Sequence, residues 1–166
     1  MEIAKLVENA KNLRKDGKHH DAEKLLRDAI DNGASDWSIW DQLGHILIAK
    51  TEYRSAVKAF REATTLNKSS FFSWLSLGYS SKEVGDLDVA IASTKKAMTL
   101  AEKPLHQGMV LYNLACDTCL LGDNERTLDY LEQCFEKDAS IKNWAREDSD
   151  LESLKTHAKF IELLDN

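Results

Sequence analysis

The stretch Trp-Asp-Gln-Leu-Gly at residues 40–44 recurs as Trp-Leu-Ser-Leu-Gly at residues 74–78. The two tryptophans are 74 − 40 = 34 residues apart, and the first copy is followed by Ala56 and Phe60 in an Ala-x-x-x-Phe step. A fixed period of this size is typical of chains built from stacked copies of one unit. Because a single unit cannot bury its own apolar face, neighbouring units stack and share one core. The recurring stretch therefore predicts a repeat fold.

The 34-residue period with W-x-x-L-G and then A-x-x-x-F resembles the tetratricopeptide repeat family. The resemblance implies an all-α fold, a right-handed α-α superhelix (tetratricopeptide solenoid) of antiparallel helix pairs. Placing each tryptophan fourth in its unit predicts a single domain, 1–166, with repeats at about 3–36, 37–70, 71–104 and 108–141. Leu77 and Leu114 are 37 residues apart. We therefore expect about three extra residues near Pro104, in the turn between the third and fourth repeats.

A different pattern follows the fourth repeat. It reads D-x-D-L-x-x-L from Asp148 and then F-x-x-L-L from Phe160, and it resembles the ending of many tetratricopeptide proteins, especially bacterial ones. Asp148 and Asp150 suit the N-terminal positions of a helix. The resemblance implies that residues 142–166 form capping helices, since the end of a repeat stack needs a face that tolerates water.

Composition narrows the classes of partner and compartment. The chain is 43% hydrophobic and 30% charged, with a formal net charge of −6, so it lacks the basic footprint of a nucleic-acid-binding protein. Its charged N-terminus lacks the apolar centre of a signal peptide, and no apolar run is long enough to cross a membrane. Three cysteines do not close a disulfide framework, so we expect a cytoplasmic protein.

The resemblance also implies a concave groove, lined by the first helix of each repeat, that holds a peptide or helical segment of a partner protein. The positions that line such grooves correspond here to Lys11, Lys15, Asp41, His45, Phe72, Leu75, Tyr79, Lys82, Met109, Tyr112 and Cys116. The predicted groove is basic toward its N-terminal end and aromatic and apolar toward its C-terminal end. Aromatic and Met side chains are enriched at interface cores. In an alternative arrangement, the C-terminal segment folds over part of this groove and buries Met109 and Tyr112.

One known ligand class of the family is disfavoured. Chaperone-binding members hold a terminal carboxylate with a clamp of Lys, Asn and Arg side chains. At the clamp positions this chain has Val7, Lys11, Gln42, Phe72 and Ser76. The clamp is absent, so we do not expect a carboxylate-clamp co-chaperone of Hsp70 or Hsp90.

Catalysis has no candidate residues in the sequence. Cys116 and Cys119 form a C-x-x-C inside a predicted helix, whereas a structural zinc site needs four ligands, and Cys134 replaces a small buried residue. No phosphate-binding or nucleophile-elbow motif occurs. We therefore predict a protein-interaction scaffold or adaptor with no cofactor and no metal. The alternatives are a self-assembling repeat module, such as a homodimer, or an assembly chaperone; an enzyme would need a metal site around Cys116 and Cys119.

Overall fold

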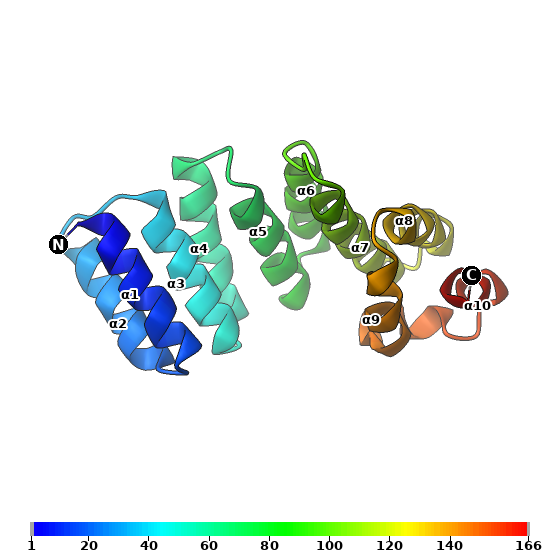
Figure 1. Cartoon of the computed structure of the whole chain (residues 1–166), viewed down its shortest axis with the longest axis horizontal. Coiled ribbons are helices and arrows are strands. Elements are labelled where there is room, and N and C mark those ends of the chain that lie inside the picture. Colours follow the sequence, from blue (N-terminus) through cyan, green and yellow to red (C-terminus); the bar gives the residue numbers. More distant parts are fainter. Residues whose placement is uncertain (1, 166) are drawn as a thin grey trace. The chain divides into compact units, whose positions relative to one another are not determined.

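The computed structural model describes residues 2–165, and the regular elements in this range are all helices (Figure 1). This confirms the predicted all-α fold. The chain forms two compact units, Met1–Asp86 (unit 1) and Leu87–Asn166 (unit 2). The single domain of residues 1–166 stays a prediction.

Unit 1 contains two helix pairs and the first helix of a third. Its helices are α1 (Ile3–Lys15), α2 (His19–Asp31), α3 (Trp37–Ala49), α4 (Tyr53–Leu66) and α5 (Phe71–Glu83). Within it α1 packs against α2, and α3 packs against α4, which in turn packs against α5. The helices α1, α3 and α5 are also neighbours, because α3 contacts both of the others. These three helices therefore share one face, which we call the first-helix face.

The repeated glycine of unit 1 allows two helices to pack closely. A Cβ atom added to Gly44 of α3 would lie 2.6 Å from Cζ of Phe60 in α4, closer than two carbon atoms can approach. The corresponding residues of the first repeat, Ala10 and Leu26, are both fully buried. A methyl group thus fits opposite leucine, while phenylalanine requires glycine. These two pairs of positions therefore belong to the core.

The turn between the helices of a pair uses one left-handed residue. In unit 1 these residues are Gly17 (φ 74°), Thr51 (φ 58°) and Gly85 (φ 80°), which are spaced by the repeat period. The Thr51 N–H donates to the Ile48 carbonyl at 2.8 Å, which closes the end of α3. Glycine adopts this backbone conformation without strain, but a β-branched residue does not. Thr51 is therefore a strained position.

Unit 2 contains α6 (Leu87–Met98), α7 (Pro104–Leu120) and α8 (Asn124–Lys137). Helix α7 packs against both α6 and α8. Pro104 is the first residue of α7, where a missing N–H costs nothing. We predicted that the extra residues of the fourth repeat form the turn around Pro104, and this was wrong. They extend α7, which has 17 residues where α3 has 13.

The C-terminal segment packs onto α7 and α8. It comprises η1 (Ala139–Ile141), α9 (Lys142–Glu147), η2 (Ser149–Leu154) and α10 (Ala158–Asp165). Leu151 and Leu154 are fully buried, and Phe160 is 1% exposed. As predicted, Asp148 is an N-cap residue, and its Oδ1 accepts the Asp150 N–H at 2.9 Å. The segment therefore shares the core of unit 2.

Candidate functional site

The first-helix face of unit 1 carries most of the predicted binding residues. They are Lys11 and Lys15 on α1, Asp41 and His45 on α3, and Phe72, Leu75, Tyr79 and Lys82 on α5. Helix periodicity explains the grouping, because residues three or four apart lie on one side of a helix. The face combines cations on α1 with aromatic side chains on α5.

A buried hydrogen-bond network joins α3 to α5 at this face. The Ser73 hydroxyl donates to Oδ1 of Asp41 at 2.6 Å, and the Gln42 amide donates to Oδ2 at 3.1 Å. Asp41 is only 8% exposed. Both carboxylate oxygens of Asp41 already accept hydrogen bonds. We therefore interpret Asp41 as a residue that holds α3 against α5, rather than as a ligand contact.

His45 lies between this network and the cations of α1. Its Nε2 is 3.6 Å from Oδ2 of Asp41, and its ring meets Phe60 edge-on at 5.1 Å between centroids. Burial lowers the pKa of His45; the Asp41 carboxylate opposes this, and the charges of Arg14 and Lys11 add to the lowering. The imidazole is therefore neutral at pH 7. The cations come close enough to affect it electrostatically.

The α5 end of the face is aromatic. Phe72 is 52% exposed, whereas Leu75 is only 7% exposed. The rings of Tyr53 and Tyr79 meet edge-on at 6.1 Å, and Lys82 Nζ lies 5.4 Å from the centre of the Tyr79 ring. Burial and the hydrogen bond with Tyr53 raise the pKa of Tyr79 to about 12. Phe72 and Tyr79 are thus available as apolar contacts, while Leu75 is a core residue.

The corresponding face of unit 2 is covered by the C-terminal segment. The Tyr112 hydroxyl of α7 donates to Oδ2 of Asp148 at 2.6 Å, and Cys116 Sγ lies 3.8 Å from the same oxygen. Cys119 Sγ is 3.2 Å from the Ser153 hydroxyl. Burial, followed by the hydrogen bond to Asp148, raises the pKa of Tyr112. The predicted alternative, in which the segment folds over this part of the face, therefore holds for Tyr112; Met109 is half-buried.

Three potential metal ligands meet at this contact. One ligand atom each from Cys116, Asp148 and Asp150 lies within 4.8 Å of the others. Asp148 already accepts hydrogen bonds from Tyr112, Cys116 and the Asp150 backbone, and a cation would have to replace them. Cys134 is fully buried, and its pKa is raised to about 12 by burial. We interpret the thiols as packing and hydrogen-bonding groups.

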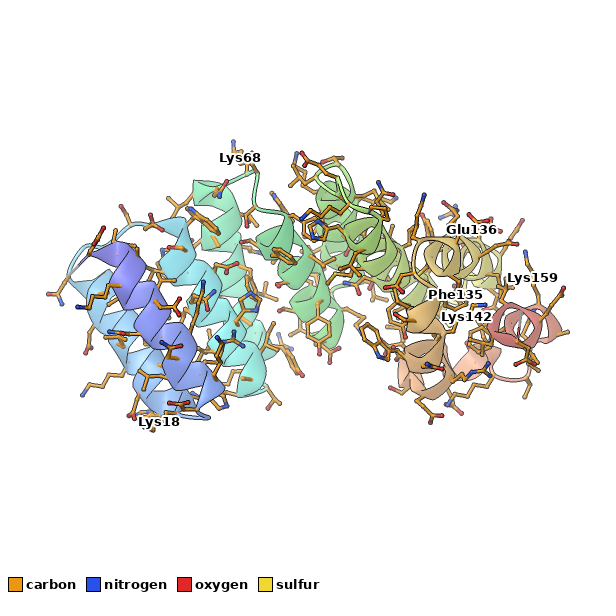
Figure 2. All side chains as sticks on the ribbon, in the orientation of Figure 1. Lys18, Lys68, Phe135, Glu136, Lys142 and Lys159 are labelled. Carbon is orange, nitrogen blue, oxygen red and sulfur yellow. The ribbon has the colours of Figure 1, made fainter. Side chains whose placement is uncertain are left out.

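Two of the hollows that lie away from the predicted binding positions are lined by charged side chains. The first, of about 510 Å³, is lined in unit 1 by Arg27, Trp40, Leu43, Leu47, Ser55, Lys58, Ala59, Arg61 and Glu62. The second lies in unit 2 between α8, α9 and α10, where Lys142 Nζ is 5.5 Å from the centre of the Phe135 ring (Figure 2). Sequence reasoning missed both, because the family resemblance directed attention to first helices. The cations spaced three apart at 58 and 61 were the available signal for the first hollow.

Comparisons with known proteins identify one repeat directly. Residues 38–70 match the model of the tetratricopeptide repeat family. Human Superkiller complex protein 3 is 25% identical over 126 residues, which cover 74% of this chain. The mouse protein of the same name is 27% identical over 125 residues. The match spans only 8% of the length of either protein.

Solved structures share the fold at low sequence identity. A MamA structure has a TM-score of 0.79 at 12% identity, covering 94% of this chain and 90% of that chain. Pseudomonas aeruginosa pilF has a TM-score of 0.79 at 15% identity, with coverages of 98% and 73%. YrrB, described as a TPR protein with an unusual peptide-binding site, has a TM-score of 0.71 at 17% identity, with coverages of 96% and 81%.

No helix within residues 2–165 has both the length and the apolarity to cross a membrane. The helix pairs recur with the spacing of the sequence signature, and the signature residues occupy the helix contacts. Together with the matched repeat at residues 38–70, these observations show a helical-repeat fold that the chain shares with solved tetratricopeptide repeat structures.

Proposed function

We propose that the protein is an interaction scaffold that binds an acidic peptide segment across the first-helix face of unit 1. The observation that carries the proposal is the group of cations on α1. Lys11, Arg14 and Lys15 form no ion pair with a carboxylate anywhere in residues 2–165, yet Lys11 and Arg14 lie close enough to His45 to lower its pKa. Uncompensated cations on one face favour an anionic partner.

Polar and apolar groups on the same face support a peptide as the ligand. Arg14 Nε and Gln42 Oε1 are buried without a hydrogen-bond partner in the described chain, so they offer a donor and an acceptor. Phe72 and Tyr79 supply apolar contacts beside them. The peptide-binding site named for YrrB shows that this fold can hold a peptide. The departure from the carboxylate clamp points to side-chain carboxylates rather than a clamped chain terminus.

A random peptide library displayed on phage provides a direct test. We expect selection on the immobilised chain to enrich acidic peptides that contain a large apolar residue. Lys11→Glu with Arg14→Glu should weaken the selected peptides at least about tenfold, because two attractions become repulsions. Tyr79→Ala should weaken them less.

Two control variants locate the site. Lys5→Glu with Lys24→Glu makes the same change in charge at exposed positions outside the cation group, and binding should persist. Lys58→Glu with Arg61→Glu alters the hollow of unit 1 that these two residues line, and this variant should also keep peptide binding. Peptides that ignore the Lys11 and Arg14 changes would refute the proposal.

A further inference from the structure

The hollow in unit 1 has an apolar floor. It lies over α3, between α2 and α4, and Leu43 and Leu47 of α3 form its base together with Ala59 of α4. These three side chains are almost fully buried, and the indole of Trp40 beside them is partly exposed. A floor of this kind accommodates an aliphatic side chain.

The rim of the hollow is basic. Arg27, Lys58 and Arg61 line it, against a single carboxylate from Glu62. Arg27 is paired with Glu23 at 2.7 Å, but Arg61 Nη2 reaches Asp86 only at 3.9 Å. Lys58 is exposed and forms no ion pair within the described residues. The α4 side of the rim therefore favours an acidic occupant.

Acidic charge is concentrated in the other unit of the same chain. Residues 1–86 contain thirteen basic and thirteen acidic residues, whereas residues 87–166 contain nine basic and fifteen acidic residues. The whole net charge of −6 thus resides in unit 2.

The turn between α7 and α8, with the first turns of α8, combines acidic and apolar side chains. Leu120 and Leu121 are 46% and 56% exposed, although aliphatic side chains usually lie inside. Asp123, Glu125 and Asp129 follow them, and Glu125 and Asp129 are exposed on one side of α8. We call residues 120–129 the acidic corner. Its one cation, Arg126, pairs with Asp123 at 3.3 Å. The corner offers an apolar tip followed by a net excess of carboxylates, which complements an apolar floor with a basic rim.

We propose that the hollow between α2 and α4 binds the acidic corner of a second copy of this chain. Leu121 enters the hollow beside Trp40, and Glu125 and Asp129 face Lys58 and Arg61. The two surfaces differ, so copies joined head to tail leave one hollow and one corner free, and the species grow with concentration until a ring closes. The opposite charges set the orientation of the contact.

Sedimentation of the full chain over a concentration series tests the proposal. At low salt the average mass should rise with concentration, and high salt should weaken association at least about tenfold because exposed charges are screened. Lys58→Glu with Arg61→Glu should give a monomer. Glu125→Lys with Asp129→Lys should do the same. A mixture of the two variants should associate again, since each now carries a surface complementary to the other.

Two further variants separate the contact from a general charge effect. Lys95→Glu with Lys96→Glu makes the same charge change on α6, outside both surfaces, and should leave association intact. Leu121→Ser should weaken association about tenfold while the fold is kept, because the side chain is exposed in the monomer.

Three results would overturn the proposal. One is a wild-type chain that stays monomeric at every concentration at low salt; another is a mixture of the reversed variants that fails to associate. The third is a selected acidic peptide that needs Lys58 and Arg61 while the chain itself stays monomeric, which would assign the hollow to a foreign partner. Lys11→Glu with Arg14→Glu should leave self-association unchanged, so failure of the peptide proposal is distinguished from failure of this one.

Discussion

Helix pairs α3–α4 and α7–α8 share one framework but differ in what lies on their first helices. Their positions correspond with an offset of 112 − 41 = 71 residues, so Asp41 and His45 of α3 correspond to Tyr112 and Cys116 of α7. In α3, Asp41 accepts a hydrogen bond from Ser73 of α5, and the charges of Lys11 and Arg14 act on His45. In α7 they hydrogen-bond with Asp148 of the C-terminal segment. A repeat thus either presents this face or uses it for its own packing, and a few side chains decide which.

The two helix pairs differ most in the residues at the contact between their helices. Gly44 faces Phe60 in α3–α4, whereas Ala115 and Leu131, which are both fully buried, occupy these positions in α7–α8. We expect Gly44→Ala to cost about 2 kcal/mol of unfolding free energy, because overpacking against the ring outweighs the better helix propensity of alanine. Urea denaturation followed by circular dichroism measures this.

Adding Phe60→Leu to that variant tests the cause. The double change recreates the alanine–leucine pair of α7–α8, so it should be more stable than the sum of the single changes by about 1–2 kcal/mol. Additive effects would show that the ring of Phe60 does not explain the glycine.

The hydrogen bond between Tyr112 and Asp148 distinguishes the covered face of unit 2. Tyr112→Phe removes a 2.6 Å bond to a carboxylate, and we expect a loss of about 1.5 kcal/mol. Tyr130→Phe on α8 is the matched control, because Tyr130 has no hydrogen bond from its hydroxyl within the described residues. Equal losses from the two variants would show that the bond to Asp148 contributes nothing specific.

Sequence alone predicted the framework because its signals are local and periodic. Trp40 and Gly44 recur one period later as Trp74 and Gly78, and Asp148 has the chemistry of an N-cap. The hydrogen bonds that distinguish the two first-helix faces are not periodic. The Ser73–Asp41 bond joins residues 32 apart and the Tyr112–Asp148 bond joins residues 36 apart, and neither pair recurs at the corresponding positions of another repeat. The sequence also did not decide where Pro104 lies, because proline suits both a turn and the first residue of a helix.

The turns of the two pairs differ by one strained residue. Thr51 adopts φ 58° where α7–α8 has Gly122 at φ 77°. We expect Thr51→Gly to stabilise the protein by about 1 kcal/mol, because relief of backbone strain exceeds the entropy that glycine adds to the unfolded chain. Gly122→Thr should destabilise by a similar amount. Opposite signs in urea denaturation support the comparison, whereas destabilisation by both variants would mean that the Thr51 hydroxyl, which donates to the Lys50 carbonyl at 2.7 Å, outweighs the strain.

The smallest expected effect concerns His45, whose counterpart Cys116 is bonded to the C-terminal segment. Because burial lowers the pKa of His45 in the folded state, the unfolded chain binds its proton more readily. The free energy of unfolding should therefore fall as the pH drops below about 6.5, the pKa of histidine in the unfolded chain. The slope should be less than about 1.4 kcal/mol per pH unit, and above this pH the contribution of His45 should be fully present. His45→Gln should flatten this slope between about pH 5 and 7. The Asp41 carboxylate works against the shift, and Lys11 and Arg14 reinforce it. An unchanged slope in His45→Gln would mean that folding does not lower the pKa of His45.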